Sequence, residues 1–259
     1  WLAPEREMVA QYILQGGSLV LLIDPEHAPK LSEDLARYGI AVGRDIVLES
    51  NPKYQLVGGD NSFLLLDGER FADHPITRPI RGMVMLRFAR SVGRGQGVPG
   101  IQLQELMHTS EYAWAETTLD GSTAPAPDIG TDRIGRVPVA VVAEVVDTSA
   151  LTIGSTHLDG SPATPVEAKK GGRLIVFGDS DFTSNELLDQ ASNIDLLQNT
   201  LAWAVGEGDQ VSIRPNPAAR GSLTLGTLDA LLMWLLSTFV VPCLAIGGAI
   251  ATYLSRRKR

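Results

Sequence analysis

The sequence predicts an α/β protein in which a mainly parallel sheet carries helices on both faces. Two apolar runs, Ser18–Ile23 and Leu174–Phe177, each follow a glycine pair and each lead to an aspartate. Runs this short and this uniformly apolar are typical of strands buried on both faces, as in parallel sheets. Helical patterns flank both runs, and this alternation is typical of α/β folds.

Helices and short strands are expected to alternate through the amino-terminal half. A helix is expected over 4–15, with Met8, Tyr12 and Ile13 as its buried stripe. Glycines are dense in 91–100, which predicts a mobile loop. The other elements expected in this half are a helix over 30–38 and strands over 40–48, 62–66, 83–90 and 101–109.

In the second half, two polar excursions, 117–136 and 150–170, flank a strand expected over 137–146. Thr183 and Glu186 have capping-box spacing, which predicts a short helix through Gln190. A longer helix is expected to start at Ser192 or Asn193 and to stop at Gly206. Its expected buried stripe is Ile194, Leu197, Leu201 and Val205.

The last segment predicts a membrane-spanning helix. Nearly every residue from Leu228 to Leu254 is apolar or small, and about 20 such residues suffice to cross a bilayer. Pro242 is expected to kink this helix, and Gly247 with Ala251 forms a small-xxx-small face for packing against another helix.

The basic end of the chain predicts the orientation of that helix. Four basic residues, 256–259, close the chain, and positive charge stays on the cytoplasmic side. Residues 1–225 are therefore expected on the opposite side of the membrane. The expected organisation is an extracytoplasmic α/β domain over 1–213, a linker over 214–226, a transmembrane helix over 227–255 and a cytoplasmic tail over 256–259.

Composition excludes several functional classes. The formal net charge is −8 over 259 residues, which argues against nucleic acid as a partner. The single cysteine, Cys243, excludes an internal disulfide and any CxxC motif. The four histidines are scattered without metal-ligand spacing, and we expect no metal and no cofactor.

Polar residues follow both apolar runs and are the candidate catalytic or ligand-binding residues. Asp24 follows the first run, and Asp179, Ser180 and Asp181 follow the second, at the end of a strand where open α/β sheets place ligands. Read through Thr183, the Asp-x-Asp-x-Thr pattern resembles that of Mg²⁺-dependent phosphatases.

Other interpretations of these residues stay open. Asp-x-Asp is also a metal-binding pattern of glycosyltransferases, and Ser180 is a candidate nucleophile. Ser180 lacks a Gly-x-Ser-x-Gly frame, however, and no histidine follows it. The structural interpretation, that Asp179 and Asp181 cap the next helix and hold the loop, is favoured.

Two further groups of residues are weaker candidates. Trp114 between two glutamates is a candidate platform for stacking a carbohydrate, although a packing role is favoured. Arg87, Arg90 and Arg94 are candidates to contact an anion, with solvated surface charge as the alternative.

Several stretches, taken in chain order, resemble one family. They are Glu7–Pro25 with its Gly-Gly-Ser-Leu-Val-Leu-Leu-Ile-Asp-Pro run, His74–Thr77, Thr109–Glu116, Arg136–Ala143, Arg173–Asn185 and the C-terminal helix with its arginine-rich end. In this order they resemble the auxiliary, GldG-like subunit of gliding-motility-type ABC transporters.

The resemblance implies a bacterial inner-membrane protein with a periplasmic flavodoxin-like or class I glutamine amidotransferase-like domain, a partner permease and a cytoplasmic ATPase. Family members usually have a further amino-terminal region, and Trp1 fits an internal start. Amidotransferase chemistry needs a cysteine at a strand–helix elbow, whereas Cys243 lies in the apolar segment. The chain has no Gly-x-x-x-x-Gly-Lys-Ser/Thr motif, so ATP hydrolysis is expected in a partner chain.

The expected function is that of a non-catalytic, membrane-anchored auxiliary subunit of an ABC-type transport or envelope-remodelling complex. The chain is expected to contact lipid, a permease, an ATPase and an external cargo or envelope partner. Two alternatives stay open. One is a Mg²⁺-dependent envelope enzyme using Asp179 and Asp181, and the other is a membrane-anchored module that binds carbohydrate or peptide.

Overall fold

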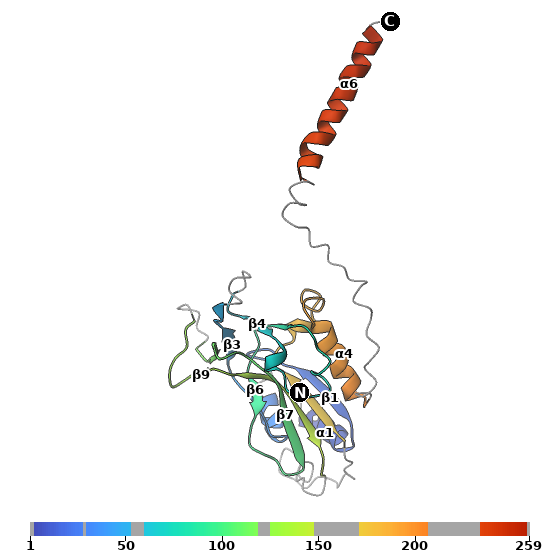
Figure 1. The fold of residues 1–259 in the computed structure, drawn as a ribbon. Coiled ribbons are helices and arrows are strands. Elements are labelled where there is room, and N and C mark those ends of the chain that lie inside the picture. Colours follow the sequence, from blue (N-terminus) through green and yellow to red (C-terminus); the bar gives the residue numbers. More distant parts are fainter. Residues whose placement is uncertain are drawn as a thin grey trace. The chain divides into compact units, whose positions relative to one another are not determined.

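The computed structural model describes residues 3–27, 30–52, 60–118, 125–147, 171–206 and 234–257 (Figure 1). The chain forms two compact units, Trp1–Ser212 and Ile213–Arg259. The first unit has an α/β fold, and the described part of the second is a single apolar helix. The excursion expected over 150–170 and the linker expected over 214–226 lie outside the described residues.

A four-stranded mixed sheet forms the centre of the first unit. Its strand order is β1 (Ser18–Leu22), β11 (Arg173–Phe177), β10 (Pro138–Val145) and β7 (Ile101–His108). β1 and β11 pair in parallel, whereas β10 is antiparallel to both of its neighbours. The expected strands are therefore present, but the expectation of a mainly parallel sheet is wrong for the described strands.

The apolar run of β10 explains this error. All but one of its eight residues are buried, because the strand lies inside the sheet with apolar side chains packed on both faces. A continuous apolar run indicates that a strand is buried on both faces, but it does not indicate the direction of the strand.

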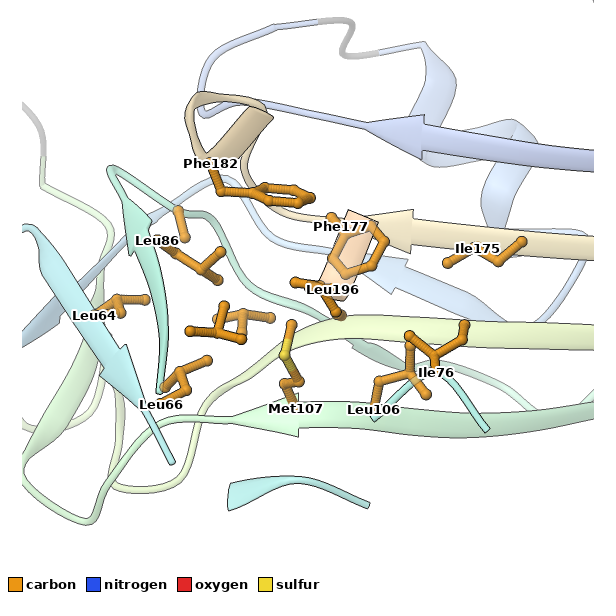
Figure 2. Close-up of a cluster of buried hydrophobic side chains, with 14 of the residues drawn as sticks. Leu64, Leu66, Ile76, Leu86, Leu106, Met107, Ile175, Phe177, Phe182 and Leu196 are labelled. Atoms are coloured by element: carbon orange, nitrogen blue, oxygen red, sulfur yellow. The ribbon is translucent and has the colours of Figure 1, made fainter. Parts of the chain in front are cut away.

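Each face of the sheet has its own apolar core. On β11, Leu174 and Val176 point into a cluster with Ile13 of helix α1 (Ala3–Leu14) and Leu35 of helix α2 (Leu31–Ala36). The alternate residues of β11 contribute to a second cluster, which contains Leu196 and Trp203 of helix α4 (Asn193–Ala204). Helices thus cover both faces. Figure 2 shows part of the second cluster, where Ile175, Phe177, Phe182 and Leu196 meet Leu106 and Met107.

The buried face of α1 differs from the expected one. Met8 and Tyr12 are exposed, whereas Ala10, Ile13 and Leu14 are buried. The ring of Tyr12 covers Gly17, where an added Cβ would lie 2.5 Å from the ring carbons. Tyr12 thus packs locally over the turn into β1 and does not enter the core.

The buried face of α4 also differs from the expected one, because polar residues contribute to it. Leu201 and Val205 are exposed, while Asn193, Asn199 and Thr200 are buried. The Asn199 side chain donates to the Ile76 carbonyl at 3.0 Å, and Asn193 donates to the Met85 carbonyl at 2.8 Å. A stripe chosen by apolar residues alone misses such polar anchors.

Three smaller sheets accompany the central one among the described residues. β2 (Ile40–Val42) pairs with β6 (Val92–Arg94), and β4 (Phe63–Leu66) pairs with β5 (Val84–Arg87). The third is β3 (Ile46–Glu49), β8 (Ala113–Glu116) and β9 (Arg133–Ile134). A short 3₁₀ turn, η1 (Gly68–Arg70), follows β4.

Two expected local structures differ from the structure. The glycine-rich segment 91–100 contains strand β6, in which Gly93 lies so close to β10 that an added Cβ would be 2.5 Å from Pro138 Cγ. Gly93 thus permits close packing, whereas 95–100 has no helix or strand. The short helix expected from Thr183 is a 3₁₀ turn, η2 (Asp181–Thr183), followed by turns.

The second unit contains one candidate membrane-spanning helix among the described residues, Leu236–Arg257, which has 22 residues and an apolar stretch that is 0% buried. At about 1.5 Å per residue this length matches a hydrocarbon core of about 30 Å. Its first part, η4 (Leu236–Val240), is π-helical, and α6 (Val241–Arg257) continues it. Pro242 explains the irregular start, because proline lacks the amide hydrogen that would close the preceding turn.

Candidate functional site

The polar residues that follow three strands lie along one edge of the central sheet. β10 is antiparallel to both β11 and β7, so β7 runs in the same direction as β11 and β1. The carboxyl end of β7 leads to Thr109, that of β11 to Asp179 and that of β1 to Asp24. This is the edge where open α/β sheets place ligand sites.

Asp24 and Ser180 bind each other at this edge. The Ser180 backbone amide donates to Asp24 Oδ1 at 2.7 Å, and the Ser180 hydroxyl donates to Oδ2 at 2.6 Å. Both carboxylate oxygens of Asp24 therefore hold the loop after β11. Among the described residues, the hydroxyl of Ser180 has a carboxylate as its partner and no histidine. This is not the geometry of an activated nucleophile.

Asp179 is fully buried and also binds backbone. Its Oδ2 accepts from the Arg87 amide at 3.1 Å and its Oδ1 accepts from the Asp181 amide at 2.8 Å. Burial raises the pKa of Asp179 to about 7, and the nearby charges of Asp181 and Asp24 act in the same direction. Asp179 thus ties β5 and η2 to the end of β11.

The elbow does not form a cluster of three or more metal-ligating side chains among the described residues. The cluster of that kind that these residues do form is Glu116, Asp128 and Asp132, in a different part of the chain. The oxygens of Asp24 and Asp179 are already used by amide and hydroxyl donors. These contacts do not favour a Mg²⁺-dependent enzyme at the elbow.

Arg90 is the residue at this edge whose role the sequence did not reveal. It is 2% exposed, and its guanidinium donates to the carbonyls of Asp24 and His27, both at 3.1 Å, and to that of Gly43. Its own carbonyl lies against Gly178, where an added Cβ would be 2.1 Å away. Neither anion binding nor solvated charge, the two roles expected of Arg90, describes this buried arginine.

The other weak candidates also have structural contacts. Arg87 lies over the rings of Phe63 and Phe88, at 5.0 Å from each centroid. Arg94 donates to the Leu103 carbonyl at 2.5 Å. Trp114 is 3% exposed and donates to Glu116 at 3.1 Å, so it is a packing residue and cannot serve as a surface platform.

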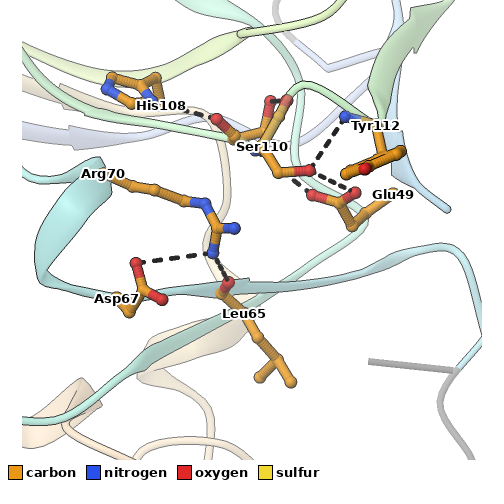
Figure 3. A network of polar contacts seen from close by, with 8 residues as sticks. Glu49, Leu65, Asp67, Arg70, His108, Ser110 and Tyr112 are labelled. Carbon is orange, nitrogen blue, oxygen red and sulfur yellow. Dashed lines mark hydrogen bonds and ion pairs between the residues drawn. The ribbon is translucent and has the colours of Figure 1, made fainter. Parts of the chain in front are cut away.

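An open cleft lies at the same edge, beyond the end of β7. It has a volume of about 480 Å³, and the residues that line it include Asn51, Arg70, Ser110, Tyr112 and Arg136. The buried carboxylate of Glu49 lies beside it and accepts from the Ser110 hydroxyl at 2.7 Å. Figure 3 shows this network with Arg70 of η1 nearby. No motif in the sequence indicated the cleft, because its residues come from four separate segments.

The residues expected to pack in the membrane lie on the apolar helix. Pro242 and Gly247 belong to α6, and an added Cβ at Gly247 would meet nothing within 4 Å. Ala251 belongs to the same helix, and its side chain lies outside the described residues.

Comparison with known proteins identifies the family. The family model described as "ABC-type uncharacterized transport system" matches residues 3–202. The chain belongs to this family of auxiliary proteins of ABC transport systems. No curated protein sequence matches the chain.

Solved structures include matches of low sequence identity. A structure titled "mmIFT52 N-terminal domain" is 15% identical, with a TM-score of 0.49, and the match covers 79% of this chain and 72% of the other.

Proposed function

We propose that this chain is a non-catalytic, membrane-anchored subunit of an ABC transport complex and couples a permease to an external α/β domain. The family match over 3–202 carries the proposal. The apolar helix Leu236–Arg257 supports it by providing a membrane anchor. The elbow supports a non-catalytic role, since its carboxylates bind the protein's own backbone.

The same proposal includes the type of subunit, its domain organisation, its location and its partners. The subunit is of the GldG-like, gliding-motility type, with an amidotransferase-related domain over 1–213, a linker over 214–226, a membrane helix over 227–255 and a tail over 256–259. It resides in the bacterial inner membrane with its main domain in the periplasm, and it contacts lipid and an external cargo or envelope partner. Its partners are a permease and a cytoplasmic ATPase, and ATP hydrolysis moves the permease and, through α6, the external domain.

Assembly is tested by co-purification from detergent. The tagged chain is expected to retain a permease and an ATPase, and purification as a solitary monomer would contradict the proposal. Gly247→Leu is expected to weaken this association, because it fills the small-residue face of α6. Ala249→Leu is the matched control, since it makes a similar change about 200° around the helix and is expected to leave the association unchanged.

Orientation is tested by labelling single cysteines with a membrane-impermeant maleimide. In a Cys243→Ser background, Thr118→Cys places a thiol on the exposed surface of the α/β unit, and Ser255→Cys places one near the basic end of α6. On spheroplasts, the cysteine at 118 is expected to react and the one at 255 only after lysis. The reverse pattern would place the α/β unit in the cytoplasm.

A further inference from the structure

The cleft beyond β7 is open, whereas the carboxylates at the ends of the neighbouring strands are engaged. At the ends of β1 and β11, Asp24 and Asp179 accept hydrogen bonds from Ser180, Arg87 and Asp181. At the end of β7, the side chains instead border a volume of about 480 Å³. This lies within the range of about 300–1,000 Å³ that is usual for small-molecule sites.

Two residues that line the cleft, Asn51 and Ser110, here called its floor, are fixed by a buried carboxylate beside the cleft. Glu49 is 4% exposed. Its Oε1 accepts from the Ser110 hydroxyl at 2.7 Å and from the Asn51 backbone amide at 3.1 Å, and its Oε2 accepts from the Ser110 backbone amide at 3.3 Å. These bonds join the end of β3 to the turn between β7 and β8. The floor is therefore ordered before any ligand arrives, which lowers the entropic cost of binding.

The rim of the cleft carries an aromatic ring on a fixed backbone. The Tyr112 amide donates to the Ser110 hydroxyl at 3.1 Å, and the Tyr112 carbonyl accepts from the Ser50 amide and hydroxyl at 3.2 and 2.9 Å. The side chain of Tyr112 is nevertheless 60% exposed. A rigidly mounted, exposed tyrosine offers an apolar face and a polar tip to a ligand at low entropic cost.

Charges of both signs line the remaining walls. Arg70 and Arg136 are positively charged, and Glu69 and Glu111 are negatively charged. Among the described residues, Glu69, Glu111 and Arg136 make no hydrogen bond or ion pair. Arg70 already donates to the Leu65 carbonyl and pairs with Asp67. In the part of the chain that the structure describes, the walls therefore offer one guanidinium, that of Arg136, and two carboxylates, those of Glu69 and Glu111, for contact with a ligand. Such a lining disfavours acyl chains and also disfavours strongly anionic ligands.

From this combination we infer that the cleft binds a neutral saccharide. Each sugar hydroxyl is both a donor and an acceptor, so adjacent hydroxyls match walls that carry both guanidinium and carboxylate groups. The apolar C–H face of a pyranose ring matches the exposed face of Tyr112. The inference concerns the α/β unit alone, and its failure would leave the co-purification result for the transport complex unaffected.

The test measures saccharide binding to the full chain by saturation-transfer difference NMR. The protein is held in a detergent without a sugar headgroup, because a glycoside detergent would compete. The probes are maltotriose, cellotriose and triacetylchitotriose, with trialanine as the peptide comparison. At least one saccharide is expected to bind saturably, and the Tyr112→Ala variant is expected to weaken that binding at least tenfold.

A matched variant distinguishes saccharide binding in the cleft from binding to any exposed aromatic side chain. Tyr12 is also exposed, at 52%, but lies on α1 outside the cleft. Tyr12→Ala is expected to leave saccharide binding unchanged, and its circular dichroism and that of Tyr112→Ala should match the wild type. The inference is overturned if no saccharide binds saturably, if Tyr112→Ala binds as the wild type does, or if trialanine binds more tightly than every saccharide.

Discussion

Asp24 and Ser180 are 156 residues apart in the sequence and are joined by two hydrogen bonds, of 2.7 and 2.6 Å. The pair connects the end of β1 to the end of β11, the two strands that form the parallel pairing of the sheet. Because both donors come from Ser180, the pair also fixes the conformation at the start of the loop that leads to η2.

This pair predicts unequal effects of removing its two partners. Ser180→Ala removes one hydrogen bond and leaves the backbone amide on Asp24, so it is expected to lower the free energy of unfolding by about 1 kcal/mol. Asp24→Ala leaves both donors of Ser180 without a protein acceptor and is expected to cost about 3 kcal/mol. Denaturant unfolding of the full chain in detergent measures both values.

The control for these variants is Thr118→Ala, which removes an exposed hydroxyl and is expected to change stability by less than about 0.5 kcal/mol. Equal costs for Ser180→Ala and Asp24→Ala would show that the backbone bond from Ser180 contributes nothing. If the Ser180→Ala variant were as stable as the control, the hydrogen bond from the Ser180 hydroxyl would contribute nothing to stability.

Gly178 is expected to tolerate no side chain. A Cβ at this position would lie 2.1 Å from the carbonyl oxygen of Arg90, and the Gly178 carbonyl accepts from the Arg90 amide at 2.7 Å. Gly178→Ala must therefore separate β11 from the segment that holds Arg90, which predicts a loss of several kcal/mol or failure to fold. Expression yield and limited proteolysis of the full chain measure this effect.

A second glycine is the matched control for that substitution. Gly97 has no atom within 4 Å of an added Cβ, and Gly97→Ala is expected to leave proteolytic resistance unchanged. If both alanine variants were equally resistant to protease, the close approach at Gly178 would not be a feature of the protein in solution.

The strands of the central sheet could be predicted from sequence because each one follows from the residues of its own short segment. β1 and β11 are mostly apolar runs of five residues between glycine pairs and aspartates, and their shortness and flanking glycines favour a strand over a helix. The direction of β10 could not be predicted in this way. A strand buried on both faces has the same composition whichever way it runs, and direction is decided by which distant segments become neighbours.

The candidate site also has a part that could be predicted from the sequence and a part that could not. The positions of Asp24, Asp179 and Ser180 at the sheet edge follow from the strands that precede them. Their partners do not, since Arg87 and Arg90 come from segments with no sequence link to the elbow. Arg90 is the clearest case, because arginine is almost never fully buried unless it is paired and here backbone carbonyls provide the partners.

Asp179 is expected to make the protein less stable as the pH rises. Its pKa is raised from 3.8 to about 7 in the folded state, so the folded state binds more protons than the unfolded state between these values. The free energy of unfolding therefore falls as pH increases through this window, by an amount on the order of several kcal/mol at about 1.4 kcal/mol per pKa unit. Asp179→Asn removes the titration.

The comparison that isolates Asp179 is the difference in unfolding free energy between the variant and the wild type, measured from pH 4 to pH 8. The variant is expected to gain stability relative to the wild type as pH increases from 4 to about 7 and to level off above that, because the buried carboxylate of the wild type is then fully charged. A difference that is constant over this range would show that Asp179 titrates in the folded state as it does in the unfolded chain.

His74 is expected to oppose this trend. It is buried, its Nδ1 accepts from the Ile76 amide at 3.2 Å, and its ring packs edge-on against Trp203 at 4.9 Å. Burial lowers its pKa from 6.5 to about 4, so the unfolded state binds more protons between these values and stability rises with pH. The contributions of His74 and Asp179 to the pH dependence of stability should therefore largely cancel between pH 4 and 6.5.

Replacing His74 is expected to reveal the contribution of Asp179. His74→Asn keeps an acceptor for the Ile76 amide but cannot titrate, so stability of this variant should fall as pH rises from 4 to 6.5. In the double variant His74→Asn with Asp179→Asn, both titrations are absent and the pH dependence should be small again. If the single His74 variant were instead flat and the wild type sloped, the opposing pair would not exist in the folded protein.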